Sequence, residues 1–252
     1  MAKIDVMSIE GSVQKSIELP HAFSERARPD LIARAAIAES TLKIQPQAHY
    51  VLAGMQTTAR YYGAMNSYRT GRHMGMAIRP REKLGGGVQG KVRVIPSSVK
   101  GKRAHPHLIE KTTVENINAK EYQKAIRSAI AASKRPVAVT SDIETLKKTK
   151  DLVKLLGRLK LENYLEDGQK KTQRKGVRRL ASQRRYKKSL LIVVSNDSSV
   201  LKAARNIPGV DACSLEKMTV SMFAPGGNPG RATVWSESAL SKLDQEISKH
   251  SI

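Results

Sequence analysis

The chain has 252 residues, with 45 Lys and Arg against 22 Asp and Glu, which gives a net charge of +23 at neutral pH. This length suffices for one large or two ordinary domains, and the charge is too extreme for an ordinary cytosolic enzyme and indicates a polyanionic partner. The single cysteine, Cys213, excludes an internal disulfide framework and a cysteine-based zinc site, and fits a reducing cytoplasm.

The first part of the chain predicts a hairpin and a helix. Apolar residues flank a turn at Glu10-Gly11-Ser12, so residues 3–19 are expected to form two strands. Pro29 suits a first helical turn and is followed at helical spacing by Leu31, Ala35, Ala38 and Leu42. The N-terminus lacks a charged region followed by an apolar one, so an export signal is not expected.

Residues 60–103 form the first of two strongly basic segments. They contain 11 Lys or Arg, one acidic residue (Glu82) and 8 of the 17 glycines. A stretch of this length without helical or strand periodicity indicates function or disorder. Doubled back on itself, it could reach about 70 Å at about 3.3 Å per residue. Its apolar area is too small for folding alone, so a partner must order it.

The residue types of this segment suit RNA. Arg and Lys neutralise crowded phosphates, and glycines let the backbone approach a sugar-phosphate chain. Tyr61, Tyr62 and Tyr68 can stack on splayed bases or pack on the core, and both readings stay open. The alternative is that this segment is a solvated, disordered run of charge without a specific partner. Charge alone does not exclude DNA, but a flexible arm enters a folded RNA more naturally than a duplex groove.

Strand and helix patterns alternate after the arm. Asn118 with Glu121 predicts a capping-box start of a helix. Pro136–Thr140 predicts a short strand, and a charged helix is expected to end in residues 151–156, interrupted by Gly157.

The second basic segment follows, with 10 Lys or Arg and no acidic residue over 170–188. Beyond it, the pattern predicts a buried strand at Leu190–Ser195, which is far shorter than the about 20 residues of a membrane span, so no membrane partner is expected. The remaining expected elements are a helix at Ser198–Arg205, strands at Val210–Cys213 and Ala232–Trp235, and a terminal helix capped by Ser236.

Alternating strands and helices predict an α/β sheet covered on both faces. We expect a single globular domain over residues 1–252, from which residues 45–105 depart as a basic arm and residues 166–189 as a basic insertion.

Three motifs invite a catalytic or metal-binding interpretation. Gly85 to Lys91 has nucleotide-binding P-loop spacing, but Val92 replaces the magnesium-binding Ser or Thr and the expected flanking strand and helix are missing. Residues 224–231 contain two prolines, which remove backbone donors, so a rigid turn beneath the core is expected instead of a phosphate cradle. His105 and His107, with His73, lack a nearby acid or cysteine of suitable spacing. We therefore expect no catalytic residue, metal or cofactor.

Specific strings then indicate a family. Leu84-Gly85-Gly86-Gly87 leads through Arg93-Val94-Ile95-Pro96 to a basic string at residues 100–106, and Thr70-Gly71-Arg72-His73 precedes them. Further strings occupy residues 191–197, 203–206, 224–231 and 233–240, with Phe223 in place of the usual Leu. In this order, across nearly the whole chain, they resemble the fourth protein of the large ribosomal subunit in its archaeal and eukaryotic branch.

The resemblance implies a three-layer αβα core with a mostly parallel sheet and an extended arm that threads into large-subunit rRNA. It also implies that the apex of the arm narrows the nascent-peptide exit tunnel beside the other tunnel-constriction protein, and that the nascent peptide passes it. The implied apex residues are Arg69, Thr70, Gly71, Arg72, His73 and Met74. Met74-Gly75-Met76 departs from the bacterial apex pattern of close-set Gly and Arg.

The candidate rRNA-binding residues lie in both basic segments, since the second one corresponds to a basic insertion of that branch. An RNA-binding regulator outside the ribosome, such as an mRNA repressor, is the alternative function, and an enzyme acting on RNA comes third. The candidates are Arg60, Arg69, Arg72, His73, Arg79, Arg81, Lys83, Lys91, Arg93, Lys100, Lys102, Arg103, His105, Arg174, Lys175, Arg178, Arg179, Arg184 and Arg185.

Overall fold

The computed structural model describes residues 3–61, 75, 77–84, 89–92, 95–172 and 185–250. The chain divides into two compact units. Residues Met1–Lys43 and Val114–Ile252 form the first, called the core unit, and residues Ile44–Thr113 form the second, called the arm unit. In the described part of the chain, no helix is both long and apolar enough to cross a membrane.

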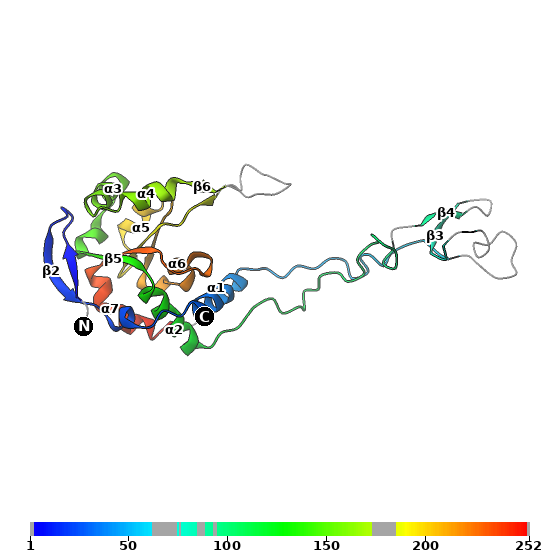
Figure 1. Ribbon diagram of the computed structural model, residues 1–252, viewed down its shortest axis with the longest axis horizontal. Helices are drawn as coiled ribbons and strands as arrows, with labels where there is room; N and C mark the ends of the chain where they lie inside the picture. Colours follow the sequence, from blue (N-terminus) through cyan, green and yellow to red (C-terminus); the bar gives the residue numbers. More distant parts are fainter. Residues whose placement is uncertain are drawn as a thin grey trace. The chain divides into compact units, whose positions relative to one another are not determined.

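A six-stranded sheet in the order β2-β1-β5-β10-β8-β9 runs through the described part of the core unit (Figure 1). Strand β2 is antiparallel to β1, and the other neighbouring pairs are parallel. Ile4 pairs with Ile17 in the first hairpin, which confirms the predicted turn. The strands are β1 (Lys3–Met7), β2 (Val13–Glu18), β5 (Lys134–Val139), β8 (Leu190–Val194), β9 (Val210–Ser214) and β10 (Ala232–Ser236).

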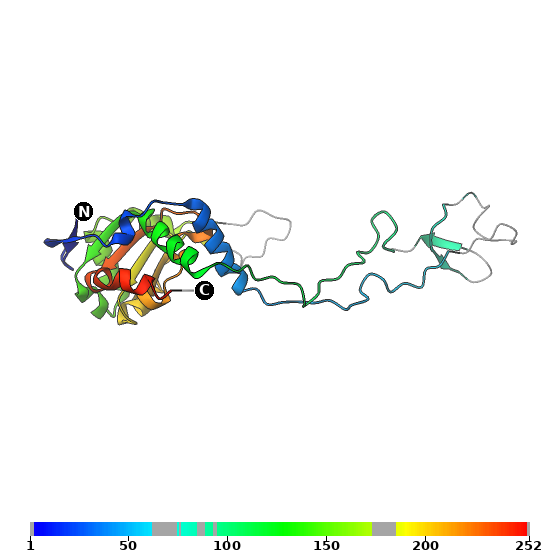
Figure 2. The same ribbon diagram turned by 90° about the horizontal axis from the view of Figure 1, so that it is seen from below.

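Helices cover both faces of this sheet, as Figures 1 and 2 show. This arrangement confirms the predicted three-layer αβα core. One face carries α1 (Pro29–Leu42), α2 (Ala119–Ala131), α6 (Val220–Phe223) and α7 (Glu237–Ile247). The other carries α3 (Thr149–Arg158), α4 (Glu162–Gln169) and α5 (Ser199–Ala204). Short 3-10 helices lie at His21–Ser24, Ser141–Thr145, Leu215–Lys217 and Pro225–Gly227.

Strand β8 shows why the sheet needs both layers. All five of its residues are buried, which matches the continuous apolar run in the sequence. Side chains alternate across a strand, so Leu191 and Val193 join one core cluster while Leu190, Ile192 and Val194 join the other. Each such buried side chain contributes about 1.5–3 kcal/mol.

Two local predictions for the helices were wrong. Helix α2 begins after Asn118, but no side chain caps it, and Glu121 instead pairs with Arg34 of α1 at 3.3 Å. Gly157 does not interrupt α3, which runs on to Arg158. The buried leucines of α3 outweigh the cost of about 1 kcal/mol that a helical glycine carries. Helix α1 extends to Leu42, as the helical spacing predicted, and Leu42 itself is 52% exposed because the buried face of α1 ends at Glu39.

One carboxylate links several elements at the carboxyl edge of the sheet. Glu144 accepts hydrogen bonds from the backbone N–H of Ser195 at 3.1 Å and from the hydroxyls of Ser236 at 2.8 Å and Ser238 at 2.5 Å. The Ser236 hydroxyl also accepts from the Ala239 N–H at 3.2 Å, which confirms the predicted cap of α7. Burial raises the pKa of Glu144, but the hydrogen bonds outweigh it and leave the pKa below its ordinary value.

This cluster predicts an acid-dependent loss of stability. The pKa of Glu144 is lower in the folded than in the unfolded chain. Its contribution is therefore present above the unfolded pKa of about 4.3 and is lost as pH falls through the folded pKa. Urea unfolding between pH 7 and pH 3 should show Glu144→Gln to be less stable at pH 7, with a shallower acid decline. A Glu144→Gln decline parallel to wild type would contradict the assignment, and Glu162→Gln, at an exposed position of α4, serves as control.

Candidate nucleic-acid interface

The arm unit contains a short ladder that the sequence did not predict. Strands β3 (Arg81–Lys83) and β4 (Gln89–Val92) pair antiparallel, and the backbone N–H of Arg81 donates to the carbonyl of Arg60 at 3.0 Å. The expectation of an arm without strands was wrong here. Strands of three and four residues are too short to show periodicity. The ladder places the backbones of several predicted RNA-binding residues side by side.

A second contact holds two distant stretches of the arm unit together. The His49 N–H donates to the His107 carbonyl at 3.2 Å, and the two imidazole rings lie 5.5 Å apart. Gly54 has a positive φ of 84°, and a Cβ there would lie 1.9 Å from the Arg103 carbonyl oxygen. Only glycine permits this approach. Residues 49–54 therefore support the stretch that carries Arg103 and His105.

A tight turn presents the most basic string of the arm unit. The Ser98 N–H donates to the Ile95 carbonyl at 3.2 Å, and the Gly101 N–H donates to the Ser98 carbonyl at 2.9 Å. Ile95 is 3% exposed and anchors the turn. A Cβ on Gly101 would lie 1.7 Å from the Ile95 carbonyl oxygen, so the turn requires glycine. Lys100 and Lys102, on either side of Gly101, are exposed.

Several exposed cations in the described part of the arm unit form no ion pair. Within the described residues, no ion pair involves Arg60, Arg79, Lys91, Lys100, Lys102 or Arg103. The guanidinium of Arg81 donates to the Ala77 carbonyl at 3.1 Å. The core unit differs, since Lys187 and Lys188 there pair with Asp167 and Asp211 at 2.7 and 2.8 Å. Cations without an acidic partner, carried on a backbone that can approach RNA closely, suit phosphate binding.

The second basic segment is anchored at both ends within the core unit. Strands β6 (Lys171–Thr172) and β7 (Arg185–Tyr186) pair antiparallel. Asp167 binds both Lys170 at 2.6 Å and Lys187 at 2.7 Å. These contacts lower the pKa of Asp167 to about 2.

Many predicted site residues lie outside the described residues, and for Lys83 and Arg185 only the backbone is described. Their proposed contacts therefore stay predictions, as does the stacking role of Tyr62 and Tyr68. Tyr61 is 36% exposed. The predicted residues outside the described ranges are Arg69, Thr70, Gly71, Arg72, His73, Met74, Arg93, Arg174, Lys175, Arg178, Arg179 and Arg184.

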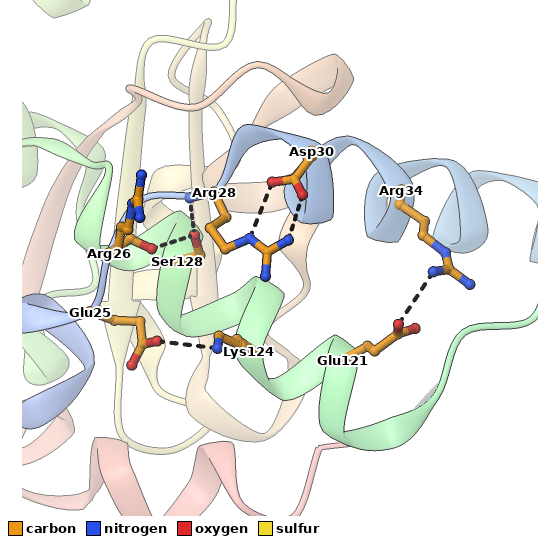
Figure 3. A network of polar contacts seen from close by, with 8 residues as sticks. All are labelled: Glu25, Arg26, Arg28, Asp30, Arg34, Glu121, Lys124 and Ser128. Atoms are coloured by element: carbon orange, nitrogen blue, oxygen red, sulfur yellow. Dashed lines mark hydrogen bonds and ion pairs between the residues drawn. The ribbon is translucent and has the colours of Figure 1, made fainter.

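Figure 3 shows polar contacts that tie α1 to α2, the two helices between which the arm is inserted in the sequence. The buried Ser128 hydroxyl accepts from the Arg28 N–H at 2.5 Å and donates to the Arg26 carbonyl at 3.1 Å. The ion pairs nearby are exposed and individually weak. The Glu115 N–H also donates to the Thr41 hydroxyl at 3.1 Å. The chain thus leaves and rejoins the core unit at a fixed base.

A buried carboxylate that sequence reasoning missed lies on α1. Glu39 is 6% exposed and accepts hydrogen bonds from the Tyr122 hydroxyl at 2.8 Å and from the N–H groups of Val220 at 2.6 Å and Ser221 at 2.9 Å. Burial and the neighbouring Glu39 raise the pKa of Tyr122. The signal was an acidic residue on the alanine-rich buried face of α1. Its role is to join α1, α2 and α6.

The motifs that suggested catalysis or phosphate binding are parts of a strand and of a turn in the structure. Gly90 and Lys91 lie in strand β4, so the helix that a P-loop requires does not follow there. Residues Pro225–Gly227 form a 3-10 turn, and a Cβ on Gly227 would lie 3.3 Å from Ala33 of α1. In the described ranges, no group of three His, Cys, Asp or Glu residues could hold a metal ion.

A three-layer α/β core with a long basic insertion, in whose described part several exposed cations form no ion pair, is typical of an architectural nucleic-acid-binding protein. Residues 17–246 match the ribosomal protein L4/L1 family, and the chain belongs to this family. This confirms the resemblance in the sequence strings.

Three archaeal relatives, each named large ribosomal subunit protein uL4, illustrate the similarity. The Archaeoglobus fulgidus protein is 35% identical, and the match covers 96% of this chain and 98% of the relative. The Methanospirillum hungatei and Methanocaldococcus jannaschii proteins are 37% and 36% identical, and each match covers 97% of this chain and 99% of the relative. The similarity therefore includes both the core unit and the arm unit.

Proposed function

We propose that the chain is a structural constituent of the large ribosomal subunit that binds large-subunit rRNA, supports its assembly and helps to form the wall of the peptide exit tunnel. Family membership over residues 17–246 carries this proposal. The family consists of structural ribosomal proteins, so the chain is not an enzyme. Its place is the cytoplasmic ribosome.

The arm unit supports this function physically. The unpaired cations among its described residues and its glycine-dependent turns suit a chain that is enclosed by crowded phosphates. If the protein neutralises 6–10 phosphates, its affinity for RNA should fall by a factor of about 10³ to 10⁵ as salt rises from 50 to 200 mM. In the proposed arrangement, residues 45–105 are an arm inserted in a single globular domain, and residues 166–189 add a second rRNA anchor.

The apex of the arm, residues 69–74, is proposed to lie at the tunnel wall. There it would meet the nascent peptide in passing and neighbour the other tunnel-constriction protein. This part rests on the family resemblance of Thr70-Gly71-Arg72-His73.

An RNA-binding regulator outside the ribosome is the alternative. Sedimentation of cell extract through sucrose in high salt separates the two functions. The proposed function predicts that the protein remains with large subunits, because an arm enclosed by RNA cannot dissociate by surface exchange. A repressor would wash off, and its recovery at the top of the gradient would contradict the proposal.

A further inference from the structure

A cavity of 870 Å³ lies beside α5 at the carboxyl ends of β8 and β9, wholly within the core unit. Strand β9 ends the sheet order, so the cavity lies at an edge of the sheet. We call this cavity the edge pocket. All the described residues of its lining belong to the core unit, and none of them lies in the second basic segment.

The lining of the edge pocket carries excess positive charge. Lys147, Lys202 and Arg205 are exposed, and within the described residues none of them pairs with a carboxylate. Lys217 pairs with Asp197. Four cations against one carboxylate leave a net charge of +3. Lys217 holds the pKa of Asp197 below its ordinary value, and Ser214 and the charge of Arg205 act in the same direction. The carboxylate of Asp197 is therefore already paired with Lys217.

Two further features limit the kind of ligand. The Ser198 hydroxyl lines the pocket and is buried without a hydrogen-bond partner in the described part of the chain. A buried hydroxyl without a partner is unfavourable, and an acceptor on a ligand would satisfy it. Apolar side chains from α5, β9 and α6 also line the pocket, namely Leu201, Ala212 and Met222. A ligand with an anionic group and a flat apolar part would match both the cations and the apolar side chains of the lining.

We propose that the edge pocket holds one unpaired nucleotide of bound RNA, with its phosphate at Lys202 and Arg205 and its base over the apolar side chains. This inference rests on the proposed RNA-binding function and adds a contact on the core unit. A nucleotide supplies the permanent negative charge and the π-face in one residue, and RNA-binding proteins take up such splayed bases. An acidic peptide along the free edge of β9 is the competing occupant.

The test measures the salt dependence of binding of full-length protein to a single-stranded RNA of mixed sequence. Each lost phosphate contact lowers the slope of log affinity against log salt by about 0.7 in single strands. Because Lys202 and Arg205 hold the same phosphate in this proposal, Lys202→Gln with Arg205→Gln should lower the slope by about 0.7. Lys150→Gln with Lys154→Gln on α3 makes the same charge change away from the pocket and should leave the slope nearer to wild type.

Ultraviolet crosslinking of the same complexes identifies the occupant. The proposal predicts a nucleotide adduct within residues 197–217 of the wild-type protein and of the α3 variant, and its loss in the pocket variant. Adducts confined to the arm, or equal slopes in the two variants, would overturn it while leaving the proposed function intact. Displacement of this adduct by polyglutamate at a concentration that leaves arm adducts unchanged would favour the peptide and also overturn it. Wild-type protein that binds no RNA would contradict both proposals.

Discussion

Replacing Lys100, Lys102 and Arg103 together with glutamine is expected to weaken binding to large-subunit rRNA more than any comparable change on the core unit. These side chains are exposed and lack acidic partners in the described structure. If each contacts one phosphate, the slope of log affinity against log salt falls by about 2 to 3, at about 0.7–0.9 per contact. Filter binding of full-length protein to rRNA across a salt series measures the slope.

The matched control replaces three exposed lysines of the core unit, Lys150, Lys154 and Lys242, with glutamine. Both variants lose the same charge, so a general loss of attraction to RNA would affect them equally. Equal slopes in the two variants would contradict a specific role of the turn at residues 95–101. The arm variant should also unfold in urea like wild type, because exposed unpaired side chains contribute little to stability.

Arg231→Met is expected to destabilise the core unit by about 3–5 kcal/mol, because it leaves two carbonyls without their donor and removes the buried one of the two cations that pair with Asp211. Arg231 is 4% exposed and donates to the carbonyls of Met222 at 2.8 Å and Leu190 at 2.6 Å. It also pairs with Asp211 at 2.8 Å. Burial raises the pKa of Asp211, but Lys188 and Arg231 outweigh it and leave the pKa lowered.

Urea unfolding at pH 7 measures this loss, and Lys188→Gln is its control. Lys188 also binds Asp211, but its side chain is 54% exposed, so that variant should lose less than about 1 kcal/mol. Arg231 belongs to a string that resembles a ribosomal family motif, and its burial assigns it to the fold. A variant that folds with wild-type stability but fails to bind RNA would contradict this assignment.

The sequence was sufficient to predict elements that depend on a local pattern of residues. The continuous apolar run at residues 190–194 predicted strand β8, and Ser236 predicted the cap of α7. The layered architecture followed from the alternation of such elements. The prediction of one domain with an arm at residues 45–105 and an insertion at residues 166–189 remains a prediction.

The residues that sequence reasoning missed act through partners far away in the chain. Glu39 binds the backbone at residue 220, and Arg231 binds the carbonyl of Leu190. For Glu39 the local sequence offers only its place among the alanines of α1, and it does not indicate the partners of either residue. The capping box at Asn118 failed for a related reason, since Glu121 found Arg34 on another helix. Strands β3 and β4 were missed because a ladder of so few residues leaves no periodic signal.

Crosslinking from two positions of the arm inside assembled large subunits tests the central claim most directly. A photoreactive residue is placed at Arg72, in the proposed apex, and at Lys102, in the string beyond the described turn. The account predicts large-subunit rRNA adducts from both positions in subunits that contain the protein. Subunits that contain it but give no RNA adduct from either position would contradict the account.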